Sequence, residues 1–166
     1  MSDPWGLEGA TVAITGASTG IGAALTDAFL DSGAIVLGIS RSPDKHPTTS
    51  PNYRTYPADL SVRTETEALI DTLKADQERI DVLINNAGHA LRAPSVDYPM
   101  DDWDRLIELN LAAPFLLSRG LAPPMLRRGA GKVIFTASLW SFLGGRSVPA
   151  YTVTKSGLAG MIRALS

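Results

Sequence analysis

A tyrosine and a lysine stand four positions apart in the last part of the sequence, at Tyr151 and Lys155. If this segment is helical, the i, i+4 spacing places both side chains on one face. A free phenol has a pKa of about 10, and a neighbouring ammonium lowers that pKa by favouring the phenolate. Such a pair can exchange a proton with a substrate oxygen. A solvated helix face can carry the same two residues by chance, so the pair alone does not establish this chemistry.

Two further polar residues, Ser138 and Asn110, are candidates for the same site. Ser138 follows the apolar run 132–137, and active-site groups of parallel α/β sheets lie just past strand ends. Its hydroxyl can donate to a substrate oxygen that gains negative charge. Asn110 falls on the apolar face of a predicted helix, where a buried amide needs hydrogen-bond partners. Local backbone bonding by Ser138 and helix-to-helix bonding by Asn110 are the alternatives.

A glycine-rich stretch, TGASTGIG at 15–22, lies between the first apolar run and the first helical pattern. In that position Gly16 permits a tight turn, Gly20 lets a pyrophosphate approach the backbone, and Gly22 lets helix and strand pack closely. The helix N-terminus offers free N–H groups to phosphates. The stretch therefore predicts a dinucleotide site. A turn without ligand and a methyltransferase turn are the alternatives, but the latter leaves the other polar residues unexplained.

The spacing Gly-x3-Gly-x-Gly resembles that of the classical short-chain dehydrogenase/reductase family. The extended members of the family usually show a different spacing. The resemblance spans essentially the whole chain and continues through Asp59, Asn85-Asn86-Ala87-Gly88, Asn110, Ser138, Tyr151 and Lys155. It implies an enzyme that transfers hydride between NAD(P)(H) and a ketone or secondary alcohol, with Asn110, Ser138, Tyr151 and Lys155 as catalytic residues. The implied cofactor residues are Gly16, Ser18, Thr19, Gly20, Ile21, Gly22, Ser40, Arg41, Asp59, Leu60, Asn86, Ala87, Gly88, Tyr151 and Lys155.

The same resemblance implies a role for several of these residues. Asp59 would bond the adenine amino group, although a carboxylate before a helix is also an ordinary cap. Residues 86–88 would line the adenosine ribose, and Lys155 would hold the nicotinamide ribose. The backbone of Asn110 would hold a water that connects Lys155 to solvent.

The predicted substrate is a keto-sugar acid. Segments 110–118 and 138–151 resemble the branch that includes 2-deoxy-D-gluconate 3-dehydrogenases and gluconate 5-dehydrogenases, and Arg146 and Trp140 are candidates for contacting substrate. The three-residue gap between Tyr151 and Lys155 is typical of members acting on carbonyls or alcohols, since enoyl reductases place six residues there. A 3-oxoacyl-carrier-protein reductase is the enzyme alternative, and a dinucleotide-binding module without turnover is the non-enzyme alternative.

The end of the second apolar run indicates which cofactor is preferred. NAD-specific folds place an acid there, but this sequence has Ser40 followed by Arg41 and Ser42. A guanidinium can bond a phosphate through two parallel N–H groups. The sequence thus predicts NADP. NAD is the alternative, because Thr19 stands where many NADP-preferring relatives carry a second basic residue, and the sugar-acid branch often uses NAD.

Predicted strands and helices alternate along the chain, and this alternation would bring the candidate residues together. Short apolar runs rich in β-branched residues predict strands at 10–15, 34–39, 80–85 and 132–137. A weaker strand pattern lies at 53–57, with Pro57 at its end. Helical patterns lie at 21–33, ended by Gly33, and at 61–78, capped by Ser61. A third pattern starts at Asp101 or Asp102 and should bend at Pro114, and a fourth starts near residue 150. The alternation predicts an α/β fold: a doubly wound parallel sheet of Rossmann type, in three α/β/α layers, as one domain over 1–166. Residues 41–52 predict a polar loop.

Composition excludes several classes of protein. The 166 residues are 45% apolar and 19% charged, with net charge −2, two histidines and no cysteine. Disulfides, cysteine-bound zinc and thiol catalysis are excluded, and a nucleic-acid partner is not expected. The start of the chain lacks a signal-peptide pattern, and the most apolar stretch, 106–126, is too polar to span a membrane. We expect a cytoplasmic enzyme with a small-molecule substrate.

The last helical pattern runs to Ser166 without a cap, whereas family members continue with further strands and a substrate loop. The sequence therefore predicts a C-terminally truncated chain with the last strands missing. We expect a 166-residue product to aggregate or to bind cofactor without useful turnover. The resemblance implies a homodimer or homotetramer for the full-length form.

Overall fold

The computed structural model describes residues 6–77 and 79–166. Five strands form a wholly parallel sheet in the order β3-β2-β1-β4-β5. They are β1 (Thr11–Thr15), β2 (Ile35–Ser40), β3 (Tyr53–Pro57), β4 (Val82–Asn85) and β5 (Lys132–Phe135). The strand order reverses on either side of β1, which is the arrangement of a doubly wound sheet. The predicted α/β class is thus confirmed.

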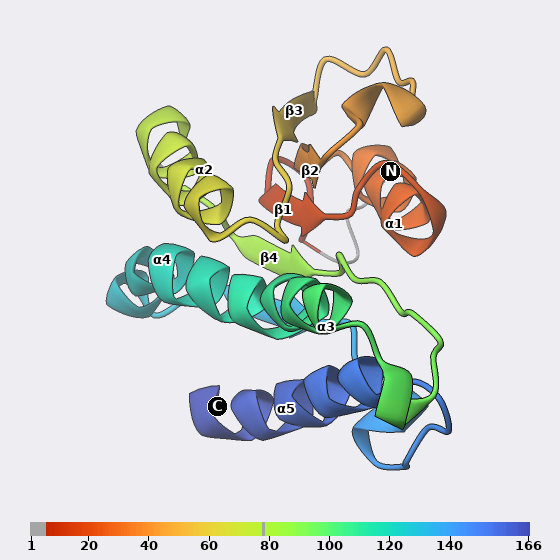
Figure 1. Cartoon of the computed structure of the whole chain (residues 1–166). Coiled ribbons are helices and arrows are strands. Elements are labelled where there is room, and N and C mark those ends of the chain that lie inside the picture. The colour runs from red at the N-terminus through yellow and green to blue at the C-terminus, as the bar shows by residue number, and fades with distance from the viewer. Residues whose placement is uncertain (1–5, 78) are drawn as a thin grey trace.

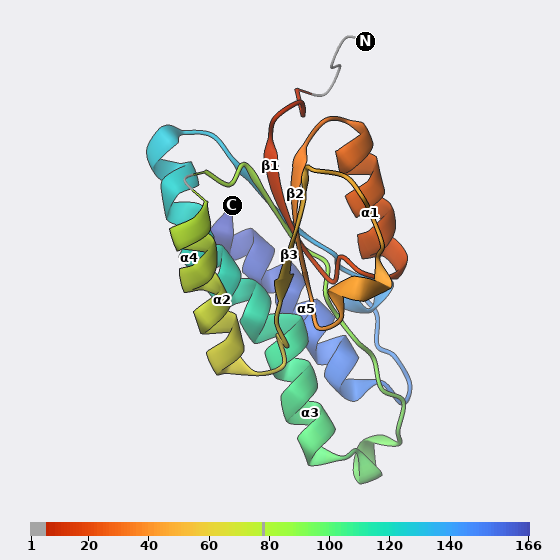
Figure 2. The same ribbon diagram turned by 90° about the horizontal axis from the view of Figure 1, so that it is seen from above.

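Helices cover both faces of the sheet (Figure 2). Helix α1 (Gly20–Asp31) lies on one face, and α2 (Arg63–Asp76) and α4 (Ala113–Arg128) lie on the other. Helix α3 (Met100–Ile107) runs into α4 through a π-helical turn, η3 (Glu108–Ala112). Helix α5 (Pro149–Leu165) lies alongside α3 and η3 (Figure 1). Short 3-10 turns are η1 (Pro43–Lys45), η2 (Ser95–Asp97) and η4 (Leu139–Ser141).

The central strand β1 explains why this sequence folds into layers. Val12 and Ile14 point toward α1, and Ala13 points toward α2 and α4, so successive residues bury opposite faces. All of β1 is buried, as a strand covered on both sides requires. The carboxyl ends of β1, β2 and β4 therefore meet at one edge of the sheet.

Two helix starts differ from those predicted. The α2 helix begins after Val62, and the Ser61 hydroxyl donates to Asp59 Oδ1 at 2.7 Å instead of capping it. The predicted end near residue 78 lies outside the described residues. Helix α3 begins after Pro99, so Asp101 and Asp102 lie in its first turn, where carboxylates favour the helix dipole. The cap position is occupied by Pro99, whose side chain has no hydrogen-bond acceptor, so α3 starts without a side-chain cap.

Among the described residues, no helix is both long enough and apolar enough to cross a bilayer.

Candidate active site

The glycine-rich turn after β1 has the backbone that a phosphate site needs. Gly16 and Gly20 have positive φ angles, +68° and +55°, which a side chain would strain. A Cβ on Gly22 would lie 1.9 Å from the Gly16 carbonyl oxygen, so only glycine fits this close turn. The first turn of α1 carries no acidic side chain that would repel an anion. The residues present therefore fit a bound pyrophosphate.

The turn after β4 is tied to β1 by side-chain hydrogen bonds. Thr15 Oγ1 accepts from the backbone N–H groups of Asn86 and Ala87, each at 2.9 Å. The Asn86 amide donates to Thr15 O at 3.0 Å, and its Oδ1 accepts from the Thr136 hydroxyl at 3.3 Å. Asn86 thus links three strand ends and has a structural role in this arrangement. Thr15 opens the glycine-rich stretch, but the sequence predicted no role for its hydroxyl, and Thr136 belongs to no motif.

A cleft of about 290 Å³ opens beside these two turns. Its lining combines the glycine turn, the end of β2, the start of the segment after β3 and the turn after β4. The predicted cofactor residues that line it are Gly16, Ser18, Thr19, Ser40, Arg41, Asp59, Leu60, Ala87 and Gly88. Gly20, Ile21, Gly22, Asn86, Tyr151 and Lys155 are not among its lining residues. Ser42, which the sequence offers as a further hydroxyl donor to the phosphate, also lines it. Lys45, His89 and Leu109 line it as well, and the sequence did not assign them to the cofactor.

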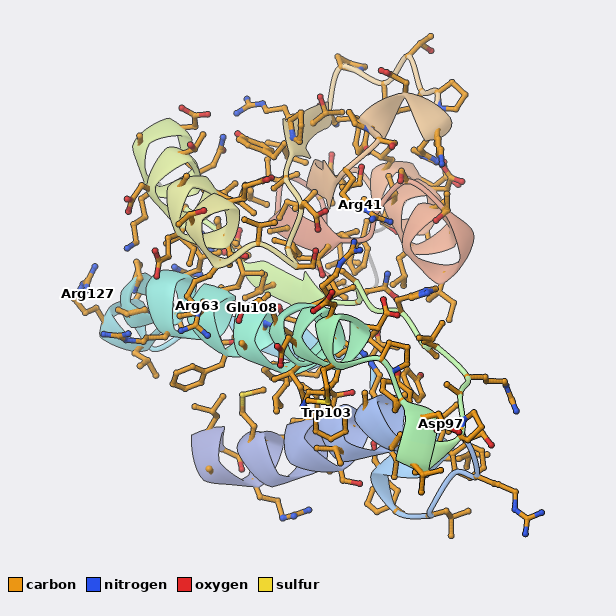
Figure 3. The ribbon with its side chains drawn as sticks, in the orientation of Figure 1. Arg41, Arg63, Asp97, Trp103, Glu108 and Arg127 are labelled. Carbon is orange, nitrogen blue, oxygen red and sulfur yellow. The ribbon has the colours of Figure 1, made fainter. Side chains whose placement is uncertain are left out.

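Arg41 and Asp59 face each other across one end of this cleft. Arg41 Nη1 lies 4.0 Å from Asp59 Oδ2, and the Arg41 side chain is 68% exposed. Figure 3 shows the Arg41 side chain, which belongs to the segment that follows β2. Partial burial opposes ionisation of Asp59, but two hydrogen bonds from Ser61 and the charges of Arg41 and Arg105 lower its pKa. Asp59 Oδ1 is taken by Ser61, which leaves Oδ2 directed at Arg41.

Ser40 lies on the same side of the cleft and carries an unsatisfied hydroxyl. Its Oγ is buried and has no hydrogen-bond partner among the described residues. Buried polar atoms are nearly always paired in folded proteins. An unpaired hydroxyl beside an exposed guanidinium therefore suits a ligand that brings its own hydrogen-bonding oxygens.

Tyr151 and Lys155 lie on the first turns of α5, with the Lys155 ammonium 5.5 Å from the centre of the Tyr151 ring. Lys155 is only 3% exposed, and its Nζ donates to the Thr136 carbonyl at 2.7 Å. Burial lowers the pKa of Lys155 by disfavouring the charged form. The structure thus brings the two residues together on one helix face, with the ammonium close to the phenol.

Asn110 lies in the π-helical turn η3 and is 1% exposed. Its Oδ1 accepts from His89 N at 3.0 Å, while its Nδ2 donates to His89 O at 2.8 Å and to Thr154 Oγ1 at 3.3 Å. These bonds fix the loop after β4 against α5. Gly88 lies against both side chains, because a Cβ at this position would be 3.2 Å from Asn110 Oδ1 and 3.6 Å from Lys155 Nζ.

Pro114 explains the distortion of this helix. In an α-helix the Asn110 carbonyl would accept from the N–H of the residue four positions later, which is Pro114, and proline has no N–H. The backbone widens into a π turn immediately before Pro114, and Ala113 N donates to Glu108 O. The Asn110 side chain is fully used in structural hydrogen bonds. The backbone carbonyl of Asn110, in contrast, has no α-helical donor.

Ser138 lies just past β5 and caps the short turn η4. Its Oγ accepts from Trp140 N at 3.3 Å, and its N–H donates to Ser141 Oγ at 3.2 Å. The loop that follows folds back on α5, since Ser156 donates to Trp140 O at 3.1 Å and Gly145 N donates to Thr152 Oγ1 at 3.2 Å. Ser138 is held at the end of the sheet by a local cap, and its hydroxyl proton is not used by that cap.

Residues 10–166 match the sequence profile of the short chain dehydrogenases. The chain belongs to this family. It is 37% identical to a 2-dehydro-3-deoxy-D-gluconate 5-dehydrogenase of Pseudoalteromonas atlantica and 33% identical to the Bacillus subtilis protein of that name, over 100% of this chain and 68% and 67% of theirs. This chain therefore spans about two thirds of the length of these relatives. The oxidoreductase class predicted from the sequence is confirmed.

Solved structures agree with this assignment. A metagenomic short-chain oxidoreductase in complex with NADP has a TM-score of 0.90 and 32% identity, over 99% of this chain and 75% of that one. A gluconate 5-dehydrogenase from Burkholderia cenocepacia J2315, in complex with NADP and tartrate, has a TM-score of 0.85 and 29% identity, over 95% and 65%. Both matches cover nearly the whole of this chain.

A larger apolar groove of about 690 Å³ lies away from these residues, between α4, β5 and the end of α5. None of the predicted catalytic or cofactor residues lines it. The chemistry is therefore assigned to the smaller, polar cleft and the buried residues behind it.

Proposed function

We propose that this chain carries the cofactor site and the catalytic residues of an NADP(H)-dependent dehydrogenase acting on a keto-sugar acid of the 2-dehydro-3-deoxygluconate or gluconate type. The observation that carries the proposal is the buried Lys155 ammonium beside the Tyr151 ring, behind a cleft built for a dinucleotide. No other pair of groups in the described residues combines a proton donor with an adjacent buried cation in this way.

Each catalytic residue has a separate task in this proposal. The bound nicotinamide supplies hydride to the carbonyl carbon or accepts it from the alcohol. Tyr151 gives its phenolic proton to the oxygen during reduction and takes one during oxidation. Lys155 stabilises the phenolate through its charge, and the Ser138 hydroxyl donates to the substrate oxygen as negative charge develops.

Asn110 positions this machinery through its hydrogen bonds to His89 and Thr154. Its released carbonyl is suited to accept from a water that returns a proton to Lys155. The cofactor would lie against Gly16, Ser18, Thr19 and Gly88, with the adenosine end near Arg41 and Asp59.

The substrate class rests on the relatives, two of which are named for 2-dehydro-3-deoxy-D-gluconate and one for gluconate. The test is turnover by the natural full-length protein with NADPH, comparing 5-keto-D-gluconate and 2,5-diketo-3-deoxygluconate with acetoacetyl-coenzyme A. We expect the sugar acids to be reduced with a kcat/KM at least roughly tenfold above the thioester. The reverse order supports a 3-oxoacyl-carrier-protein reductase. Cofactor binding without turnover of any of the three would support a binding module.

A homodimer or homotetramer in the cytoplasm completes the proposal. It is supported by the resemblance to the family, whose members assemble through their two long helices. Sedimentation of the full-length protein tests the assembly, because a monomer at micromolar concentration would contradict it.

A further inference from the structure

The adenosine end of the cleft holds more positive charge than Arg41 alone. Its lining residues include two cations, Arg41 and Lys45, and one carboxylate, Asp59. Asp59 lies 4.0 Å from Arg41 and offsets part of that guanidinium's charge. A phosphate monoester carries about −1.5 to −2 charges near pH 7, so Arg41 paired with Asp59 leaves such a group undercompensated.

Lys45 is placed to supply the missing charge. It is the last residue of η1, it is exposed, and it lines the cleft together with Ser40, Arg41 and Ser42. No ion pair of Lys45 is recorded within the described part of the chain. Its ammonium is therefore available to a ligand without first leaving a carboxylate.

The neighbouring His46 holds η1 in this place. His46 Nε2 lies 3.2 Å from Asp27 Oδ1 on α1, and its ring makes an edge contact with Tyr53 on β3. The His46 side chain is 11% exposed, although it belongs to a polar loop. His46 Nε2 is buried and forms no hydrogen bond within the described residues, so the Asp27 contact is one of proximity and charge. The loop 41–52 is thus docked on α1 and β3 next to the cleft.

We propose that Lys45 is a second determinant of NADP(H) selectivity, and that its ammonium pairs with the 2′-phosphate of the cofactor's adenosine alongside Arg41. The inference rests on the proposed NADP(H) site but does not depend on the substrate. Lys45 contributes to the phosphate alone, whereas the glycine turn contributes to the pyrophosphate that NAD and NADP share. Removing the ammonium should therefore affect only ligands that carry the 2′-phosphate.

The test measures binding of two cofactor fragments, 2′,5′-ADP and 5′-ADP, by calorimetry on the full-length protein. Lys45→Ala should raise the Kd of 2′,5′-ADP roughly tenfold, the usual size of a hydrogen bond to a charged group, and leave that of 5′-ADP unchanged. Lys45→Arg should restore most of the affinity. The matched control is Lys74→Ala, in the last turn of α2 outside the cleft, which should change neither Kd. In about 1 M salt the effect of Lys45→Ala should shrink, because exposed charges are screened.

Three results would overturn the inference. Lys45→Ala could leave both Kd values unchanged, or it could raise both equally, as a structural role would. The parent could also fail to prefer 2′,5′-ADP to 5′-ADP. The first two results leave the proposed NADP(H)-dependent activity standing. The third would also remove the NADP(H) preference from the proposed function, but it would leave turnover of a keto-sugar acid with NADH possible. Failure of the parent to bind either fragment would instead remove the dinucleotide site on which both proposals stand.

Discussion

The two ends of the candidate site are built in opposite ways. At the adenosine end, Arg41 and Lys45 are exposed and reach the cleft from a loop. At the catalytic end, Asn110, Thr154 and Lys155 are buried. Asn110 donates to the Thr154 hydroxyl and to the His89 carbonyl, and Lys155 donates to the Thr136 carbonyl just past β5. Exposed charges contribute to ligand choice and little to stability, whereas buried polar networks carry both. Substitutions should therefore separate into two groups.

The largest expected effect lies at the catalytic end and leaves the fold intact. Tyr151→Phe removes only the transferable proton, since the ring that lies near Lys155 is retained. We expect kcat of the full-length enzyme to fall by about 10²–10⁴ while the Kd of NADPH stays within roughly twofold. Steady-state kinetics and fluorescence titration of cofactor test this. Near-normal turnover by the Phe variant would remove Tyr151 from the mechanism.

A second substitution at this end should damage stability as well. Asn110→Ala removes three hydrogen bonds and leaves the backbone N–H and carbonyl of His89 without their side-chain partner. We expect the free energy of unfolding to fall by about 2–4 kcal/mol, because the site is buried. Urea denaturation measures it, and Asn52→Ala, in the loop before β3, is the control. A loss below about 0.5 kcal/mol would mean that the loop after β4 is held by other contacts.

The adenosine end should respond in selectivity instead. Arg41→Ala removes a guanidinium, and Ser40→Asp puts a carboxylate where the structure leaves an unpaired hydroxyl. We expect either change to lower the ratio of kcat/KM for NADPH to that for NADH by about 10–100-fold, through loss of a charge-assisted contact or through repulsion. The melting temperature of Arg41→Ala should stay within about 2 °C, since the side chain is exposed. An NADH preference in the parent that Arg41→Ala leaves unchanged would contradict the NADP assignment.

The sequence predicted the sheet well because its signals are local. Four of the five strands are short apolar runs, and Gly16, Gly20 and Gly22 mark a turn that few other residues can form. The exception is β3, whose sequence is YRTYP. Helix starts were predicted less well. Ser61 has the right type for a cap, but it bonds Asp59, and only the packing of the preceding loop decides between the two.

The site residues also fall into those predicted from local spacing and those placed by contacts between distant segments. Tyr151 and Lys155 are joined by helix spacing, which is visible in the sequence. Lys45 and His89 reach the cleft through contacts between distant segments: His46 with Asp27 for the first, and Asn110 with the His89 backbone for the second. No spacing rule connects residues 27 and 46 or 89 and 110. The π turn was predicted only as a bend at Pro114, because its position depends on how Asn110 is held.

The smallest effect concerns Asp59, the one carboxylate among the residues that line the cleft. Burial opposes its ionisation, but the Ser61 hydrogen bonds and the arginines lower its folded pKa below the value in the unfolded chain. An acid with a depressed pKa stabilises the fold above its unfolded pKa, near 3.8, and this contribution is lost as the pH falls through the folded pKa. Asp59→Asn should therefore lower the free energy of unfolding by less than about 1 kcal/mol at pH 7, and the difference from the parent should vanish in acid.

Urea denaturation between pH 7 and pH 3 measures this difference, with Asp104→Asn, an exposed carboxylate on α3, as the control. A deficit that persisted unchanged at pH 3 would show that the introduced amide disturbs the turn sterically instead of removing a charge. In that case Asp59 would belong with the buried, structural residues of the catalytic end, and the division between the two ends would have to be redrawn at the segment after β3. A deficit confined to neutral pH would place Asp59 with Arg41 and Lys45, as a charge that tunes the adenosine end and contributes little to the fold.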